Sequence, residues 1–240
     1  MNFKNKNALF CALDMKSIEQ AISVTSTLKD YIDGIKIGME AFYSMGIDGY
    51  RRLQDLNTPI FLDLKLHDIP NTVKSAIEAL VKLNPYMINV HTTGGSEMLR
   101  AAVSVLNECK ENKPKLVGVT ILTSMDQSSF DEQGIKLDIE DQVINLATLA
   151  ADCGLDGVVC SPHEANRVKD TCGSNFLTVV PGIRIEENKL DDQKRILTPE
   201  QALSNGADIL VVGRPLTKAR DPIEVARVIR NSIEDYAQQN

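Results

Sequence analysis

The sequence lacks the features that mark membrane-spanning, secreted and disulfide-bonded proteins. No apolar run approaches the roughly 20 residues that cross a bilayer. The opening residues, MNFKNKN, have no apolar stretch of the kind found in signal peptides. The five cysteines are scattered and form no C-x-x-C pair, so we expect buried reduced thiols rather than disulfides or a metal site. These absences predict a cytoplasmic protein.

Positive charge and histidine are also scarce. The chain has 26 Lys and Arg residues against 33 Asp and Glu, a net charge of −7, which argues against nucleic acid or an acidic membrane as its main partner. An anionic ligand would therefore have to be held by local positive charge. The histidines at 67, 91 and 163 show no metal-ligand spacing. The sequence also lacks the G-x-S-x-G motif that carries the nucleophile of many hydrolases.

Short apolar runs alternate with longer amphipathic segments along the 240 residues. The strand candidates are residues 8–14, 34–38, 60–65, 87–91, 115–122, 157–160, 176–180 and 208–213. The clearest helical candidates are residues 17–31, 72–84, 140–153 and 222–236. With no Pro-, Gly- or Ser-rich linker between these units, the pattern predicts an α/β fold, a single (β/α)8 TIM barrel over residues 1–240. An open, doubly wound sheet is the alternative. Asn71 or Thr72 is the expected cap of the helix over 72–84.

Charged residues occur at the ends of the first three strand candidates. Because successive side chains of a strand face opposite sides, Asp63 and Lys65 share a face opposite the leucines of the same run. Lys36 and Asp14 likewise lie opposite the apolar residues of their own strands. We expect the apolar faces to pack on the outer helices and the four charged side chains to converge at the carboxyl-end mouth of the barrel, where barrel enzymes carry their active sites.

The stretch FLDLKLHDIPNTV (61–73) adds a third charge, Asp68, soon after Asp63 and Lys65. In a surface loop such residues usually form a solvated salt-bridge network. Here they end an apolar strand, and buried ion pairs are poor devices for stability alone because both charges lose their hydration. Each carboxylate would also keep a neighbouring ammonium protonated inside a cleft. A functional charge cluster is therefore favoured.

Six motifs lie in one order along the chain. They are ALD (12–14), KIG (36–38), DLKLHDIPNT (63–72), LTSM (122–125), PGIR (181–184) and GRP (213–215). In this order, and at the ends of these strand candidates, they resemble the orotidine 5′-phosphate decarboxylase family. The resemblance covers essentially the whole chain, and the run over 63–72 is its most specific part.

That resemblance implies decarboxylation of orotidine 5′-monophosphate to UMP without a metal or organic cofactor, through an alternating array of Lys36, Asp63, Lys65 and Asp68. Loss of CO2 leaves negative charge on a ring carbon, and fixed positive charge nearby stabilises it. We expect Lys65 to be this cation and to protonate the carbon afterwards. Asp63 would lie beside the substrate carboxylate, a secondary contribution. Lys36 and Asp68 would orient Lys65.

The resemblance also implies the residues that bind the substrate. In barrels, the loops after the last two strands often bind phosphate, where Gly213 permits close backbone approach and Arg214 offers a forked donor. Asp14 suits a ribose hydroxyl, and Ser124 suits the amide edge of the base. The expected substrate-binding residues are Asp14, Lys36, Asp63, Ile69, Thr72, Thr123, Ser124, Pro181, Arg184, Gln193, Gly213 and Arg214. The resemblance further implies a homodimer in which Asp68, Ile69 and Thr72 serve the partner's site.

Three other functions remain open. A related barrel enzyme that shares D-x-K-x-x-D uses Mg²⁺ for sugar-phosphate chemistry, but it would need a carboxylate near the end of the second strand, where this sequence has Lys36. A Schiff-base aldolase is disfavoured because two carboxylates near Lys65 would keep that lysine protonated. A catalytically silent nucleotide-phosphate binder is the third possibility. Residues 126–134 are either part of a cover over the site or a plain surface loop.

Overall fold

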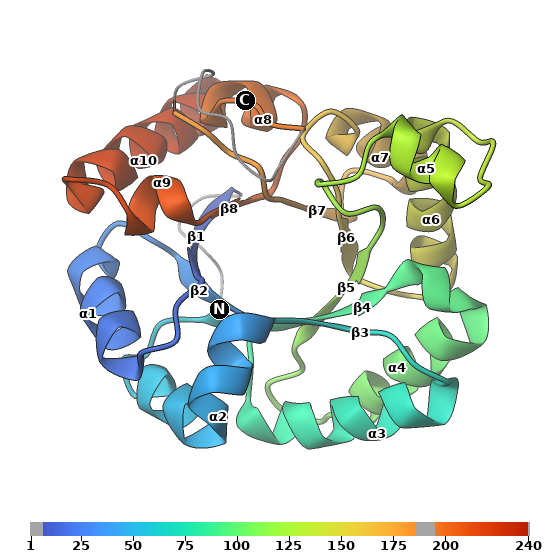
Figure 1. Ribbon diagram of the computed structural model, residues 1–240, viewed down its shortest axis with the longest axis horizontal. Helices are drawn as coiled ribbons and strands as arrows, with labels where there is room; N and C mark the ends of the chain where they lie inside the picture. The colour runs from blue at the N-terminus through green and yellow to red at the C-terminus, as the bar shows by residue number, and fades with distance from the viewer. Residues whose placement is uncertain (1–6, 186–194, 240) are drawn as a thin grey trace.

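The computed structural model describes residues 7–185 and 195–239, and its eight parallel strands close into a barrel surrounded by helices (Figure 1). The strands are β1 (Ala8–Leu13), β2 (Gly34–Gly38), β3 (Ile60–Leu66), β4 (Met87–His91), β5 (Lys115–Val119), β6 (Gly157–Val159), β7 (Leu177–Val180) and β8 (Ile209–Val212). Each strand pairs with the next in sequence, and β8 pairs with β1. The closed barrel confirms the predicted TIM-barrel fold and excludes the open sheet.

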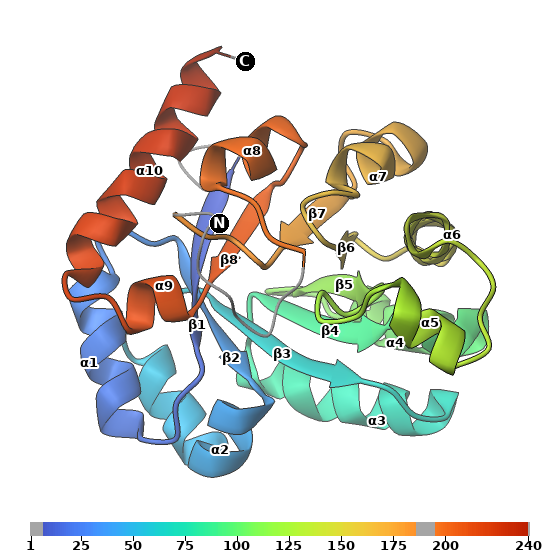
Figure 2. The same ribbon diagram turned by 45° about the horizontal axis from the view of Figure 1, so that its top comes forward.

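The helices form an outer layer around the strands (Figure 2). They are α1 (Ile18–Leu28), α2 (Met39–Gln54), α3 (Pro70–Leu80), α4 (Gly95–Glu108), α5 (Gln127–Glu132), α6 (Ile139–Asp152), α7 (Ala165–Cys172), α8 (Pro199–Ser204), α9 (Arg214–Thr217) and α10 (Pro222–Gln239). Short 3-10 turns follow α3 at Val81–Leu83 and precede α4 at Thr92–Gly94. The four helices predicted most clearly are all present, and their ends differ from the predicted ends by a few residues.

The start of α3 differs from the prediction. Neither Asn71 nor Thr72 caps this helix, because it already begins at Pro70, with Ile69 in the N-cap position and no side-chain cap. Proline is well suited to the first helical position, since its fixed φ is helical and its missing N–H would have no partner there. Asp68 and Ile69 are therefore the last two residues before a helix.

The two faces of the barrel strands pack against different layers. Leu62 and Leu64 of β3 are buried in the outer core, between the sheet and the helices. Phe61 of the same strand belongs to a second cluster, with Phe10 and other side chains on the opposite face of the sheet. This arrangement confirms the predicted alternation. It leaves the inward face of β3 to carry Asp63 and Lys65 beyond Phe61, towards the carboxyl-end mouth.

The cysteines agree with the expectation of reduced thiols. All five cysteines lie in the described part of the chain and are free thiols, and three of them are buried. Burial raises the pKa of the Cys11 thiol to about 12, so this thiol is protonated and unreactive at neutral pH.

Within residues 7–185 and 195–239, no helix combines the length and apolar character needed to cross a bilayer.

Candidate active site

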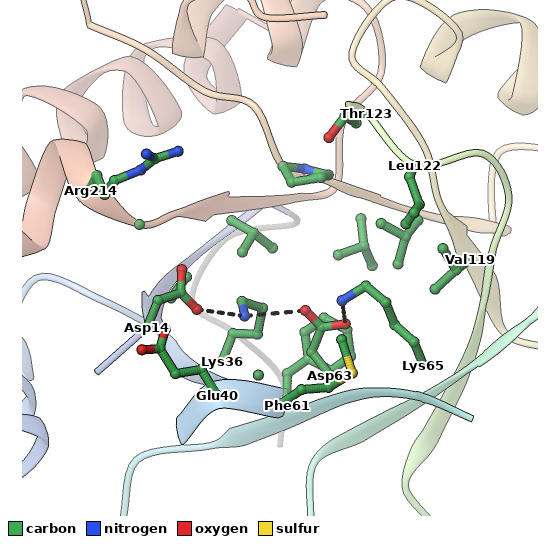
Figure 3. A pocket seen from close by; sticks show the side chains of 18 of the residues that line it. Asp14, Lys36, Glu40, Phe61, Asp63, Lys65, Val119, Leu122, Thr123 and Arg214 are labelled. Atoms are coloured by element: carbon green, nitrogen blue, oxygen red, sulfur yellow. Dashed lines mark hydrogen bonds and ion pairs between the residues drawn. The ribbon is translucent and has the colours of Figure 1, made fainter. Parts of the chain in front are cut away.

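A cavity of about 350 Å³ opens at the carboxyl ends of the barrel strands (Figure 3). Its lining comes from both ends of the strand order and includes Ala12 of β1, Val119 of β5 and Val211 of β8. The predicted site residues among its lining are Asp14, Lys36, Asp63, Lys65, Thr123, Pro181, Arg184, Gly213 and Arg214. The structure therefore brings residues from the first and last strands of the sequence into one pocket.

Four charged side chains form a continuous chain of ion pairs along one wall of the cavity (Figure 3). The Lys36 ammonium nitrogen lies 3.3 Å from Asp14 Oδ1 and 3.2 Å from Asp63 Oδ2. The Lys65 ammonium nitrogen lies 2.6 Å from Asp63 Oδ1. Opposite charges therefore alternate along this row, and Asp63 stands between two ammonium groups.

This alternation holds the buried members of the array in their charged forms. Burial by itself would lower the pKa of Lys36, but the Asp63 and Asp14 carboxylates outweigh it and raise that pKa above its ordinary value. Burial would likewise raise the pKa of Asp63, but Lys36 and Lys65 outweigh it and lower that pKa. At neutral pH the cavity wall therefore carries fixed charges of both signs.

The backbone at Lys65 has an uncommon conformation. Its φ is +52°, in the left-handed region, which costs a residue other than glycine about 1–3 kcal/mol. The β3–β4 register changes here, because Leu62 pairs with Ile88 whereas Leu66 pairs with Val90. Backbone strain of this kind persists only where the surroundings enforce it, and it concentrates at functional sites. No pattern within the strand sequence indicates this irregularity.

Asn89, which none of the sequence motifs includes, lies directly beside the array. The residue is completely buried on β4. Its side-chain nitrogen Nδ2 donates to Asp63 Oδ1 at 2.6 Å, and its oxygen Oδ1 accepts from the Lys65 backbone N–H at 2.8 Å. A signal was present in the strand MINVH, because the alternation places its asparagine on the inward face, where apolar side chains prevail.

Two residues soon after Lys36, Gly38 and Glu40, lie next to the array or the cavity. A Cβ atom on Gly38 would lie 2.8 Å from the Lys36 ammonium nitrogen, so a larger residue at this position would displace that group. Glu40, in the first turn of α2, also lines the cavity and was missed in the sequence. Its exposed position one turn beyond the strand gave no sign of a pocket residue.

The segments after β7 and β8 carry the two predicted phosphate-binding arginines, and both arginines line the cavity. The chain turns at Gly182, whose φ of +83° favours glycine, and reaches Arg184, which is buried. The Arg184 N–H donates to the carbonyl of Leu197 at 3.0 Å and so ties the two ends of this connection together. Arg214 is the first residue of α9 and extends towards the cavity in Figure 3. Gln193 lies outside the described residues.

Arg195 joins this side of the cavity to the loop after β5. It forms an ion pair with Glu164, which is almost fully buried. Its Nη2 also donates to the Leu122 carbonyl oxygen at 3.2 Å, next to the pocket residue Thr123. In the sequence, Arg195 belonged to a charged stretch typical of a solvated loop, so its contacts were not predictable.

The loop after β5 is more ordered than the two interpretations of its sequence assumed. Residues 127–132 form the short helix α5, and Asp126 caps it by accepting from the Ser129 N–H. Phe130 of this helix is completely buried and anchors the segment to the outer core. Thr123 lines the cavity, whereas Ser124 is exposed and is not among the lining residues of the described chain.

Asp68, Ile69 and Thr72 are exposed, and within the described residues they do not line the cavity of their own chain. Asp68 Oδ1 accepts the N–H of Ile69 at 2.7 Å, an interaction that shapes the turn into α3. The first three members of the predicted Lys-Asp-Lys-Asp array are thus joined by ion pairs, and the fourth lies at the surface.

The described residues contain no group of three or more His, Cys, Asp or Glu side chains that could hold a metal ion. The carboxylates of Asp14 and Asp63 are separated by the Lys36 ammonium, which occupies the place that a cation between them would take. The rings of His67 and His91 lie 5.3 Å apart. Burial, His67 and Lys65 together lower the pKa of His91, so this histidine is uncharged at neutral pH.

The sequence matches a family model described as the orotidine 5′-phosphate decarboxylase / HUMPS family over residues 7–229. It is 44% identical over 227 residues to an orotidine 5′-phosphate decarboxylase of Wolbachia sp. subsp. Brugia malayi, covering 95% of this chain and 99% of that relative. It is 47% identical over 214 residues to one of Carboxydothermus hydrogenoformans, covering 88% and 89%. The crystal structure of an orotidine 5′-phosphate decarboxylase from Lactobacillus acidophilus matches with a TM-score of 0.83 at 39% identity, covering 95% of this chain and 99% of that one.

Proposed function

Because the chain belongs to the orotidine 5′-phosphate decarboxylase / HUMPS family, we propose that its barrel-mouth cavity decarboxylates orotidine 5′-monophosphate to UMP and CO2. Family and relatives support this reaction as a step of pyrimidine biosynthesis. The observation that carries the residue assignments is the row of ion pairs from Asp14 through Lys36 and Asp63 to Lys65. We assign the catalytic unit to the whole chain, residues 1–240, as one domain.

Lys65 is the proton donor in this proposal. Departure of CO2 leaves an electron pair on the pyrimidine carbon, and a fixed ammonium next to it stabilises the charge and then protonates the carbon. The Lys65 side chain is 24% exposed in the cavity, whereas that of Lys36 is 11% exposed and lies between two carboxylates. Lys65 is therefore the ammonium better placed to touch a ligand.

Asp63 has two roles in the proposed reaction. Its carboxylate holds both ammonium groups, at 2.6 Å from Lys65 and 3.2 Å from Lys36. It also faces the substrate carboxylate, and the repulsion between them eases as CO2 departs, which we treat as a secondary contribution. Asp14 is half-exposed and suits a ribose hydroxyl, with Lys36 beside it.

The far side of the cavity binds the phosphate in this proposal. Arg184 and Arg214 are its cationic donors, while Pro181 and Gly213 bring the backbone close to the ligand. Gln193 joins them on the strength of the family resemblance alone. Thr123 and Ser124 contact the base or ribose. Binding energy from the phosphate then helps to hold the pyrimidine against Lys65, at the other end of the ligand.

We further propose a homodimer in which Asp68, Ile69 and Thr72 complete the partner's site. Support comes from exposed apolar side chains near the mouth of the cavity. Tyr43 of α2 is 72% exposed and Ile69, just before α3, is 67% exposed. Met39 is also exposed and lines the cavity itself, so one of these apolar side chains lies at the pocket. Such a surface favours burial against a second copy, which would place three surface residues near another cavity.

We also propose that the protein acts in the cytoplasm and needs neither a metal nor an organic cofactor. The five free thiols fit a reducing compartment. The Lys36 ammonium between Asp14 and Asp63 fits a site whose positive charge comes from the chain itself. The same geometry disfavours the Mg²⁺-dependent alternative, which would need carboxylates free to bind the ion.

A direct assay tests the proposed reaction. The purified protein is mixed with orotidine 5′-monophosphate, the loss of orotate absorbance is followed, and UMP and CO2 are quantified. We expect equal amounts of the two products. Absence of turnover by a folded sample would overturn the proposal. If that sample still bound UMP tightly, the silent nucleotide-phosphate binder would be the correct alternative.

Replacing Arg214 with alanine should weaken the binding of phosphorylated ligands. A hydrogen bond to a charged group contributes about 1.5–3 kcal/mol, so we expect the UMP dissociation constant to rise about 10- to 100-fold. Uridine, which lacks the phosphate, should bind the variant and the wild type alike. The exposed Arg220, replaced by alanine, is the matched control. Equal losses of UMP and uridine affinity would contradict a phosphate-binding role for Arg214.

A further inference from the structure

We propose that Asn89 is a positioning residue that sets the location of the Lys65 ammonium relative to Asp63. The inference rests on the proposed decarboxylation for its chemical meaning, and adds a residue of β4 to the row of ion pairs that joins Asp14 to β2 and β3. Asn89 does not line the cavity among the described residues, so it acts through its neighbours rather than on the ligand.

The register of the two strands makes Asn89 the sole residue opposite an enlarged stretch of β3. Leu62 pairs with Ile88, and the next paired residues are Leu66 and Val90. Between these pairs β3 contains residues 63, 64 and 65, whereas β4 contains residue 89 alone. The extra length bends β3 away from regular pairing, as in a β-bulge, and such irregularities re-aim side chains next to active sites.

The Asn89 side chain supplies a partner that this irregular backbone requires. In a regular parallel pair, a backbone N–H inside a strand donates to a neighbouring backbone carbonyl. The Lys65 N–H instead donates to the Asn89 side-chain oxygen at 2.8 Å. Without this acceptor, the backbone N–H of Lys65 would lose its hydrogen-bond partner at the floor of the barrel mouth. Lys65 is also the residue whose φ is +52°.

The other end of the same amide fixes the carboxylate of Asp63. Asn89 Nδ2 donates to Asp63 Oδ1 at 2.6 Å, and the same oxygen accepts from the Lys65 ammonium. Exchanging the amide nitrogen and oxygen would place an acceptor against the carboxylate and a donor against an N–H. The orientation of the amide is therefore determined by its two partners.

Asn89 thus joins the backbone of Lys65 to the side chain of Asp63 through one rigid planar group. The side chain is completely buried, so neither hydrogen bond competes with water. If the Lys65 backbone relaxed to an ordinary extended conformation, its side chain would leave the direction that brings the ammonium to Asp63. Catalysis by a proton donor depends steeply on such placement.

Asn89→Ala is the first test, with orotidine 5′-monophosphate as substrate and UMP as the binding probe. Because displacing a catalytic group by about 1 Å can lower a rate about 100-fold, we expect kcat to fall by about that factor. The UMP dissociation constant should stay close to the wild-type value, since the ribose and phosphate contacts are untouched. Thr25→Ala is the matched control, because it removes an equally buried polar side chain from α1, remote from the array.

Asn89→Asp is the second test, and it uses a variant of nearly the same shape. The introduced carboxyl still accepts the Lys65 N–H, but it lies against Asp63 Oδ1. The titratable groups near it are Asp63, which it contacts, and Lys65, whose ammonium binds the same Asp63 oxygen. Lys36 binds the other oxygen of Asp63, and His91 lies two residues along β4. Two adjacent carboxyl groups retain one proton to a higher pH than either alone.

The shared proton gives this variant a pH dependence of known sign. At low pH the proton bridges the two carboxyl groups and imitates the amide donor, so activity approaches that of the wild type. As pH rises the proton is lost, the two carboxylates repel each other, and activity falls. We therefore expect the ratio of variant to wild-type kcat to decrease with rising pH. A ratio that did not change with pH would overturn the proposed role.

Three further outcomes would show plain structural support rather than positioning. If Asn89→Ala retained wild-type kcat, or lost UMP affinity and thermal stability in proportion to kcat, the proposal would be overturned. A crystal structure of Asn89→Ala should show Lys65 outside the left-handed region and its ammonium displaced from Asp63; an unmoved Lys65 would also overturn it. This structural result stands even if the wild type fails to decarboxylate the substrate, so the two proposals fail separately.

Discussion

Replacing Lys65 with alanine should lower kcat by at least about 10⁴-fold, because the variant loses two catalytic effects. General acid catalysis contributes about 10²–10⁴-fold, and a fixed cation at the developing charge contributes about 10²–10³-fold. The barrel should remain folded, since this side chain extends into the cavity rather than the core. Asp63 would keep its contacts with Lys36 and Asn89. Steady-state kinetics, circular dichroism and UMP binding together measure these expectations.

Two further substitutions make this result specific. Lys65→Arg keeps a positive charge but gives up an ammonium that can release its proton, so its rate should stay far below the wild-type rate. Lys74→Ala, on the exposed surface of α3, removes a lysine that pairs only loosely with Glu78, at 3.9 Å, and should leave kcat unchanged. Near-normal activity of Lys65→Ala would show that another group donates the proton.

The second large effect concerns Asp68 in the proposed homodimer. Asp68→Ala should lower kcat about 100-fold if this carboxylate orients the catalytic groups of another chain. When Lys65→Ala and Asp68→Ala chains are combined at random, about half of the dimers are mixed and each mixed dimer has one intact site, so about a quarter of the wild-type activity should return. Co-expression of the two chains, followed by kinetics on the purified mixture, measures this recovery.

A matched pair of variants controls for recovery by other routes. Lys65→Ala and Lys36→Ala both damage the site of their own chain, so their mixture should show no recovery. If the Lys65→Ala and Asp68→Ala mixture also remained inactive, Asp68 would act within its own chain or the protein would not pair as proposed. Either result bears on the subunit arrangement and leaves the assignment of Lys65 untouched.

The barrel and the charge array were predictable because they follow from local periodicity. The two-residue repeat of a strand places Leu62 and Leu64 on one face and Asp63 on the other, whatever the rest of the chain does. Eight repeats of strand and helix then leave few ways to bury both faces of a parallel sheet. The same reasoning placed Lys36 beside Asp63, and the two side chains form an ion pair.

The features that were missed depend on contacts between segments. The role of Asn89 arises from a change of β3–β4 register, which no pattern within either strand reveals. Arg195 acquires a buried partner, Glu164, that lies 31 residues away in the sequence. The start of α3 was misplaced because Pro70 competes with the polar residues that follow it for the first turn.

The central claim is that positive charge from the chain itself, rather than from a metal ion, drives the loss of CO2. The most direct test compares the rate of orotidine 5′-monophosphate decarboxylation in the presence of excess EDTA with the rate in added Mg²⁺. We expect the two rates to be equal, because Lys36 and Lys65 are already in place beside Asp63. Activity that disappeared with EDTA and returned with Mg²⁺ would contradict this mechanism.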